Sequence, residues 1–184
     1  MELKNMTLIE LWDLFPITFI NSNLGFKEIY FEEEQNLKLL VGNYIKRISH
    51  IGSTSIQDIK TKPIVDILIE IDLNNKNICK ELLLNNDYIL MNESTNKISF
   101  NKGYTINGYA DKVFHIHIKE YGDCDELYFR DYLNDNRIKA KEYEKLKLNL
   151  FNKYKPNRDL YTDGKNEFVN EVVNLAREKY KDRY

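Results

Sequence analysis

The sequence predicts an α+β domain with an α/β-like layout, in which a mixed β-sheet is flanked by helices and a helical cap forms the carboxy-terminal part. Short runs rich in β-branched residues alternate with helical patterns up to about residue 121, and from about 122 to 184 the patterns are helical only. No repeat, low-complexity tract or Gly/Pro-rich linker divides the chain. Residues 1–184 are therefore expected to form a single domain.

The individual elements follow from hydrophobic periodicity. Strands are expected where apolar residues alternate or run together, and helices where they recur at every third or fourth position. Between residues 113 and 118, for example, Val113, His115 and His117 share one strand face. The predicted strands are Pro16–Ile20, Arg47–Ile51, Ile64–Ile71, Tyr88–Met91, Ile98–Phe100 and Val113–Ile118. The predicted helices are Ile29–Tyr44, Asn74–Asn86, Glu126–Asn134, Arg137–Tyr154 and Asn166–Tyr180.

Composition narrows the class of protein. Charged residues make up 30% of the 184 residues, but the formal net charge is only −2, so no strong field favours nucleic acid or an anionic membrane. The chain has no apolar run near the ~20 residues of a membrane span and no signal-peptide pattern at its start. Cys79 and Cys124 lack the paired spacing of a disulfide framework or zinc finger. A cytoplasmic location is therefore expected.

The most informative stretch is His50-Ile-Gly-Ser-Thr-Ser55 followed by Lys62-Pro-Ile-Val-Asp66. Gly52 allows a tight turn, and the amides and hydroxyls after it can hold a phosphate oxygen. Asp66 lies inside an apolar strand, where a carboxylate needs hydrogen bonds or a cation to compensate its burial. The pattern indicates a phosphate-plus-metal site. The alternative is a hydroxyl-rich turn that hydrogen-bonds Asp66 and locks two strands together.

This stretch resembles the signature of the GrpB-like family, within the nucleotidyltransferase superfamily. Further segments resemble the family along nearly the whole chain, among them the His-x-His strand formed by His115 and His117. The others are Leu11-Trp12-Asp-Leu-Phe-Pro16, Glu33, Phe129-Arg130-Asp131-Tyr-Leu133, and Tyr161 with Lys165 and Phe168. The resemblance implies a nucleotidyltransferase-type mixed sheet and a nucleotide-linked role.

The resemblance also raises a question about activity. Active nucleotidyltransferases carry two carboxylates spaced Asp-x-Asp on one strand face, where both reach the cations that bridge the triphosphate. Asp66 matches the first and is the candidate catalytic residue, but position 68 is Leu. Glu70 lies four residues further along, roughly 13 Å away at ~3.3 Å per residue, and cannot simply replace it.

His115 and His117 are candidate metal ligands together with Asp66. Two imidazoles at positions i and i+2 share a strand face and can converge on one cation, which Asp66 would complete if the two strands are neighbours. Imidazole ligands shift the preference from Mg²⁺ toward Zn²⁺, Mn²⁺ or Fe²⁺. The alternative is that both rings hydrogen-bond to Asp66 or to the glycine turn.

Other residues of the signature are candidates for holding substrate or phosphate. Ser53 and Thr54 can donate to phosphate oxygens, or instead cap a short helical turn through Ile56 and Asp58. His50 either contacts the ligand or only orients the loop. The remaining two candidates are Lys62, for which solvation at the surface is the expected alternative, and Arg130, which can pair with a phosphate or with a carboxylate such as Glu33.

The sequence thus predicts a protein that binds a nucleotide or phosphorylated metabolite, with a divalent metal ion (Mg²⁺, Mn²⁺ or Zn²⁺) as cofactor. If catalysis is retained, the chemistry would be metal-dependent nucleotidyl transfer, or metal-dependent phosphoester hydrolysis. The alternative is a catalytically inactive ligand-binding or interaction module on the same fold, which Leu68 favours.

Overall fold

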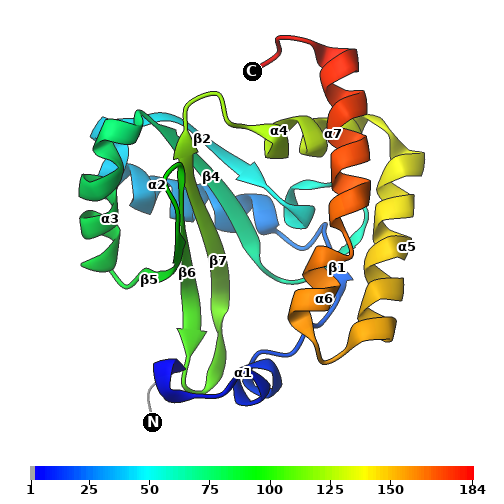
Figure 1. Cartoon of the computed structure of the whole chain (residues 1–184), viewed down its shortest axis with the longest axis horizontal. Coiled ribbons are helices and arrows are strands. Elements are labelled where there is room, and N and C mark those ends of the chain that lie inside the picture. The colour runs from blue at the N-terminus through cyan, green and yellow to red at the C-terminus, as the bar shows by residue number, and fades with distance from the viewer. Residues whose placement is uncertain (1–2) are drawn as a thin grey trace.

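The structure is a computed structural model that describes residues 3–184. Its centre is a five-stranded mixed sheet with the strand order β2-β4-β7-β6-β5, in which only β4 and β7 run parallel (Figure 1). These strands are β2 (Ile45–Ile51), β4 (Val65–Ile71), β5 (Ile89–Glu93), β6 (Lys97–Thr105) and β7 (Gly108–Glu120). Two short strands, β1 (Ile20–Asn21) and β3 (Lys60–Thr61), pair separately.

Helices cover both faces of the sheet, as Figure 1 shows. The helices are α1 (Leu8–Leu14), α2 (Phe26–Val41), α3 (Lys76–Leu84), α4 (Asp125–Asp135), α5 (Arg137–Tyr154), α6 (Arg158–Asp163) and α7 (Asn166–Tyr180). Helices α2 and α3 lie on one side, and α4 to α7 form the carboxy-terminal cap on the other (Figure 1). The predicted fold class, a mixed sheet flanked by helices with a helical cap, is confirmed.

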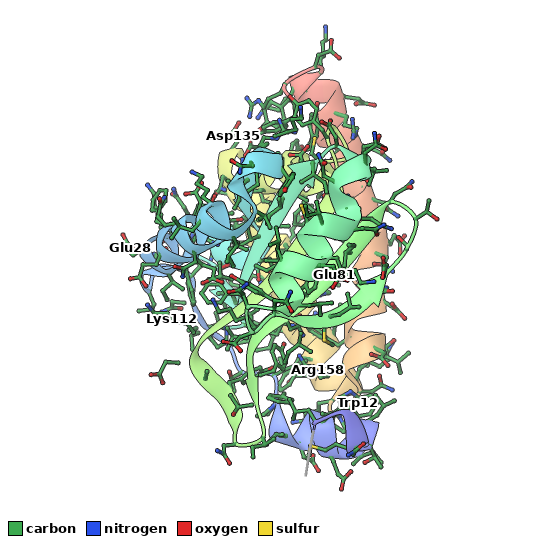
Figure 2. All side chains as sticks on the ribbon, turned by 90° about the vertical axis from the view of Figure 1, so that its left-hand side faces the viewer. Trp12, Glu28, Glu81, Lys112, Asp135 and Arg158 are labelled. Carbon is green, nitrogen blue, oxygen red and sulfur yellow. The ribbon has the colours of Figure 1, made fainter. Side chains whose placement is uncertain are left out.

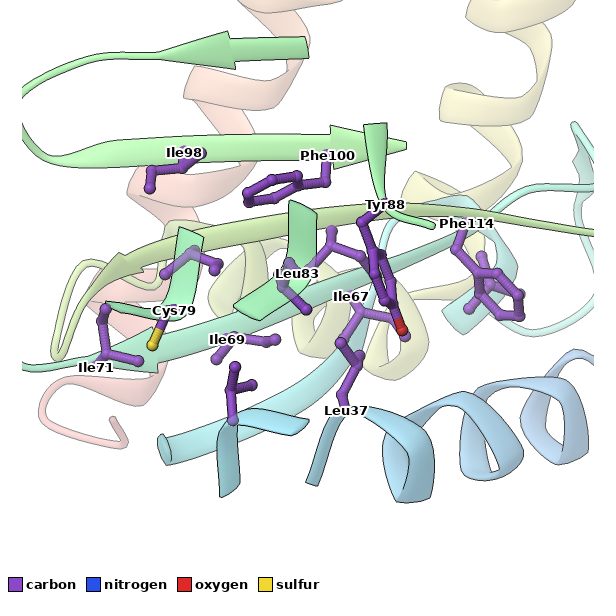
Figure 3. Close-up of a cluster of buried hydrophobic side chains, with 14 of the residues drawn as sticks. Leu37, Ile67, Ile69, Ile71, Cys79, Leu83, Tyr88, Ile98, Phe100 and Phe114 are labelled. Atoms are coloured by element: carbon purple, nitrogen blue, oxygen red, sulfur yellow. The ribbon is translucent and has the colours of Figure 1, made fainter. Parts of the chain in front are cut away.

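Strand β4 divides the core between the two faces. Its residues Val65, Ile67, Ile69 and Ile71 pack against α2 and α3 in the main cluster, part of which Figure 3 shows. On the other face Leu68 packs under α4 and α7 with Ile51, Cys124, Leu127, Tyr128 and Ala176. The alternation along β4 is the one that the sequence predicts, and it turns Asp66 toward the cap.

The helices of the cap differ from expectation in one respect that matters below. Apolar residues recur at Tyr143, Leu146, Leu150 and Tyr154, a helical spacing that predicts a buried stripe, but the last three side chains are only half-buried. The residues that α5 buries are Ala140, Tyr143 and Lys147. A charged side chain therefore continues the apolar stripe toward the sheet. Helices α1 and α6, which hydrophobic periodicity did not predict, are seven and six residues long.

No helix of residues 3–184 is long and apolar enough to cross a membrane. Cys79 and Cys124 are buried free thiols in different clusters, Cys79 beneath α2 and Cys124 beneath α7.

Candidate functional site

Asp66 lies on β4 at the centre of a cross-strand row. It pairs with Ile51 of β2 on one side and with His115 of β7 on the other, and His117 stands beside Leu68 in the same parallel register. The Oδ1 atom of Asp66 lies 3.1 Å from Nδ1 of His115 and 3.9 Å from Nε2 of His117. The structure thus brings together the three residues that the sequence proposes as metal ligands.

Gly52 makes room for the Asp66 carboxylate. Its φ of +68° lies in the left-handed region, which favours glycine. A Cβ built on Gly52 would stand only 2.1 Å from Oδ2 of Asp66. The turn therefore needs glycine both for its backbone conformation and for the close approach of the carboxylate.

Hydrogen bonds determine the charge of this group. Burial alone would raise the pKa of Asp66, but the hydrogen bond from His115 and the neighbouring imidazole of His117 outweigh it and hold the pKa well below its usual range. Burial lowers the pKa of His115, and its hydrogen bond to Asp66 opposes this. We therefore assign His115 as neutral, with Nδ1–H donating to Asp66 and Nε2, 2.7 Å from the Tyr104 hydroxyl, accepting from it.

The second imidazole has a different partner. Nδ1 of His117 lies 3.3 Å from the hydroxyl of Ser99, on the neighbouring strand β6. This contact turns Nε2 of His117 toward Asp66. Together with Gly52 and Phe129, Asp66 and His117 line a pocket of about 330 Å³ between the sheet and the cap.

Three lysines surround this carboxylate from the cap side. Burial, together with the neighbouring charges of Lys165 and Arg158, lowers the pKa of Lys62 to about 7, and Asp66 opposes the shift. Burial likewise lowers the pKa of Lys147 to about 7, with Lys165 adding to the effect. The pKa of Lys165 is also lowered by burial and raised by Asp66. We call this group of four mutually interacting side chains, Asp66, Lys62, Lys147 and Lys165, the lysine chamber.

The aromatic walls of the chamber come from α5 and α6. The ammonium of Lys165 lies 4.7 Å and that of Lys62 5.5 Å from the ring centroid of Tyr161. Lys147 lies over Tyr143 at 4.8 Å and donates a hydrogen bond of 2.6 Å to the Lys60 carbonyl. Among residues 3–184, the structure shows neither Lys62 Nζ nor Lys165 Nζ in a hydrogen bond or a salt bridge. Their positive charge is therefore uncompensated by direct contact.

Lys62 departs from expectation. Instead of extending into solvent from the surface, it is half-buried with its ammonium inside the chamber. The reason is the cap: α6 and the start of α7 fold over the beginning of β4, which the sequence of β4 alone does not reveal.

The hydroxyls of the glycine turn are used inside the protein. The Ser53 hydroxyl bonds that of Thr61 at 2.5 Å, and the Thr54 hydroxyl bonds Nε2 of His50 at 2.9 Å and the Ile64 carbonyl at 3.2 Å. Residues 53–55 form one turn of 3-10 helix without a side-chain cap. The expected helical turn through Ile56 and Asp58 with a hydroxyl cap is therefore wrong. These bonds tie the turn to the chain just before β4. This resembles the alternative considered above, in which the hydroxyls of the turn lock two strands together.

His50 and Arg130 lie in a different pocket, at the β2 edge of the sheet. His50 stacks on Tyr30 of α2 with ring centroids 5.0 Å apart, and burial lowers its pKa to about 4. Arg130 donates to the His50 carbonyl at 2.9 Å and to Asp131 at 2.8 Å. Both residues and Thr54 line a pocket of about 540 Å³ beside the start of α2. The predicted site thus divides: Gly52, Asp66, His115 and His117 meet, whereas His50 and Arg130 stand apart.

The expected pairing of Arg130 with Glu33 is also wrong. The carboxylate of Glu33 accepts hydrogen bonds from Lys102 at 2.7 Å and from the Tyr88 hydroxyl at 2.5 Å, on the α2 side of the sheet. Glu70 is fully buried and paired with Arg47, so it does not replace the missing second carboxylate.

The sequence reasoning missed Lys147, Tyr104 and Arg158. One signal was present for Lys147: it follows Tyr143 by four positions, so a lysine continues a buried helical stripe. Tyr104 and Arg158 gave no such signal, since both reach the site through the β6–β7 hairpin and the short helix α6.

Comparisons with known proteins place this geometry in a family. A sequence model of the family described as "GrpB protein" matches residues 16–175, which include every site residue named above. The chain belongs to the GrpB family. The resemblance seen in the sequence is thereby confirmed.

Other GrpB-family proteins extend the match. The chain is 34% identical over 166 residues to the glutamate-rich protein GrpB of Alkalihalophilus pseudofirmus, covering 86% of this chain and 94% of that protein. It is 33% identical over 183 residues to the UPF0157 protein YqkA of Bacillus subtilis, covering 96% of this chain but only 52% of that protein. A crystal structure of the conserved protein GrpB from Enterococcus faecalis superposes with a TM-score of 0.77 at 25% identity, covering 89% of this chain and 99% of that one.

Proposed function

We propose that this protein binds a nucleotide or another phosphorylated small molecule in the lysine chamber. The observation that carries the proposal is the charge balance: the ammonium groups of Lys62 and Lys165 lie over the same Tyr161 ring, and Asp66 is the carboxylate that opposes the lowering of both pKa values. Burying ammonium groups without compensation is costly, and the depressed lysine pKa values express that cost. An anionic ligand would offset it.

Phosphate is the anion that this arrangement suits best. Lysine ammonium groups are compact point charges with three donors each, and they bind phosphate oxygens readily. Lys62 and Lys165 approach the chamber from different elements, so their charges can contact neighbouring phosphates rather than one oxygen. Asp66 is half-buried beside these lysines, where its carboxylate could bind a cation that accompanies a polyphosphate.

Asp66, His115 and His117 are the residues that would hold such a cation. One carboxylate oxygen and two imidazole nitrogens converge, a donor set typical of Mn²⁺ or Zn²⁺ rather than Mg²⁺ alone. For His115 to bind the cation through Nδ1, its proton would move to Nε2, which would then donate to the Tyr104 hydroxyl. Within residues 3–184, however, no group of three or more Cys, His, Asp or Glu side chains is already arranged as a metal site. We therefore propose that a divalent cation binds weakly alone and more tightly together with phosphate oxygens, which supply the remaining ligands.

Binding is favoured over two-cation nucleotidyl transfer. The second carboxylate of the Asp-x-Asp pattern would stand at position 68, which is a fully buried leucine packed under α4 and α7. No open position faces the chamber there. The alternative is an interaction module that binds no phosphate. It can be distinguished by experiment, because it predicts that the three lysines bind no anionic ligand.

The proposal is tested by calorimetric titration of inorganic tripolyphosphate with Mn²⁺ into the parent protein and into Lys165→Met. We expect the substitution to weaken binding roughly tenfold or more, since it removes a charge-assisted contact worth about 1.5–3 kcal/mol. The matched control is Lys145→Met, on the exposed side of α5. Melting curves of both variants show that they are folded. Equal affinities for the two variants, or no binding by the parent protein, would refute the proposal.

A further inference from the structure

A second hollow adjoins His115. It is a groove of about 500 Å³ between α1, β5 and the β6–β7 hairpin. Its outer wall is apolar and aromatic, formed by Leu11, Trp12 and Phe15. Its inner end is polar, with Asn101, Tyr104 and His115. Phosphate binding does not require an apolar and aromatic groove, so this groove needs a separate explanation.

The strand register connects the groove with the lysine chamber. Ile89 of β5 pairs with Asn101 of β6, Asn101 with His115 of β7, and His115 with Asp66 of β4. Paired residues of neighbouring strands share a face and stand about 5 Å apart. The row therefore runs without interruption from the floor of the groove to the Asp66 carboxylate, and His115 is the residue common to both spaces.

Arg158 is a second residue that is close to both the groove and the lysine chamber. It lines the groove, contributes to lowering the pKa of Lys62 in the chamber, and donates a hydrogen bond of 3.1 Å to the Phe15 carbonyl. Figure 2 shows Arg158 and Trp12 close to one another at the α1 end of the molecule, in agreement with their shared place in the groove lining. A ligand that lies along the row would pass both.

The groove has the chemistry of a site for a flat ring with polar edges. The ring of Tyr104 packs against that of Phe15 at a tilt of 55°, with centroids 4.8 Å apart, and Trp12 is half-buried in the wall. Among the described residues, the Asn101 amide and the Trp12 indole N–H have no hydrogen-bond partner. Aromatic faces stack on rings, and a free amide pairs with the donors and acceptors of a base edge.

We propose that the groove binds the nucleobase of a nucleotide whose phosphates lie in the lysine chamber. The inference rests on the proposed function and narrows its ligand from any phosphorylated molecule to a nucleoside polyphosphate. Trp12 and Tyr104 stack on or flank the base, Asn101 bonds its edge, and His115 lies between base and phosphates.

The test uses Trp12, the single tryptophan of the chain, as its reporter. ATP, GTP, CTP, UTP and tripolyphosphate, each with Mn²⁺, are titrated into the parent protein while tryptophan emission and heat are recorded. We expect at least one nucleoside triphosphate to quench or shift the emission and to bind roughly tenfold more tightly than tripolyphosphate, since base stacking supplies the difference. Tripolyphosphate should leave the emission almost unchanged.

Three variants make the test specific to the groove, with affinity measured by heat. Trp12→Leu should lose the preference for the nucleoside triphosphate while keeping its affinity for tripolyphosphate, and Trp12→Phe should restore most of the preference. Phe31→Leu, at a half-exposed aromatic residue of α2, is the control and should change neither.

The outcomes separate the two proposals. If tripolyphosphate and all four nucleoside triphosphates bind equally and the emission stays constant, the groove does not bind a base and this inference is overturned, while phosphate binding stands. If no ligand binds, the proposed function fails and this inference fails with it.

Discussion

Gly52 and Asp66 approach each other so closely that any side chain at position 52 would overlap the carboxylate. The Cβ position of Gly52 lies 2.1 Å from Oδ2 and 2.8 Å from Cγ of Asp66. The glycine turn that the sequence marks as a phosphate loop is thus also the wall against which Asp66 is held. This contact makes the placement of the carboxylate experimentally accessible.

We predict that Gly52→Ala displaces Asp66 and weakens ligand binding. The substitution adds strain at a φ of +68° and forces the carboxylate to move, because the two groups cannot both keep their places. Gly122→Ala is the matched control, with a φ of +94° and no atom within 4 Å of the added Cβ. Urea unfolding should show a cost of about 1 kcal/mol for the control and about 1–3 kcal/mol more for Gly52→Ala. Equal losses of unfolding free energy in the two variants would show that the Asp66 carboxylate can move without a measurable cost.

Leu68→Asp is expected to destabilise the protein rather than to create a two-cation site. Leu68 is fully buried against Leu127 and Ala176, so a carboxylate there would be an unpaired buried charge. We expect a loss of about 3–5 kcal/mol in the free energy of unfolding. Leu68→Met, which nearly keeps the volume, should cost less than about 1.5 kcal/mol. A stable Leu68→Asp protein that binds Mn²⁺ more tightly than the parent would show that α4 and α7 open over this position.

Ligand binding should take up protons near neutral pH. In the free protein Lys62 and Lys147 have a pKa of about 7, so at pH 8 both are mostly neutral. A bound phosphate favours the charged ammonium and raises these pKa values, so each lysine that contacts phosphate gains a proton on binding. The affinity for tripolyphosphate should therefore fall as the pH rises from about 7 to 9.

The measurement is the binding enthalpy at pH 8 in two buffers of different ionisation enthalpy. The slope gives the number of protons taken up, and Lys62→Met should reduce it relative to the parent protein and to Lys145→Met. The same slope in all three proteins would mean that Lys62 does not contact the ligand.

A buried ion pair on the cap side of the sheet gives a separate test of the core. Nη2 of Arg47 donates to Oε1 of the fully buried Glu70 at 2.7 Å. Arg47→Met leaves that carboxylate buried without its partner and should cost about 3–5 kcal/mol in unfolding free energy. The double variant Arg47→Met/Glu70→Leu should recover much of this loss. If the double variant is less stable than Arg47→Met alone, Glu70 stabilises the fold even without Arg47, and the expected cost of the unpaired carboxylate is absent.

Sequence periodicity predicted most of the fold because the side chains that pack in the core must be apolar, and their spacing differs between helices and strands. The alternation through Val65–Ile71 placed Asp66 and Leu68 on one face, and Arg137–Tyr154 and Asn166–Tyr180 are the bounds of α5 and α7 in the structure. Helix α6 was missed because six residues carry too little periodicity to identify.

The site was predictable only in part, since register and the position of the cap are tertiary properties. The pairing of Asp66 with His115 could be expected if their strands were neighbours, and they are. His50 pairs with Ile67, so alternation turns it away from Asp66 toward Tyr30, but this register cannot be read from one strand. The ammonium groups of Lys62 and Lys165 lie over the same Tyr161 ring only because α6 and the start of α7 fold over the beginning of β4.

The most direct test of the account is a crystal structure of the protein with Mn²⁺ and tripolyphosphate, using the anomalous signal of manganese to locate the ion. We predict an anomalous peak beside the Asp66 carboxylate, within coordination distance of at least one of His115 and His117, and phosphate density against Lys62 and Lys165. Phosphate density in the pocket of His50 and Arg130, or manganese bound away from Asp66, would contradict it.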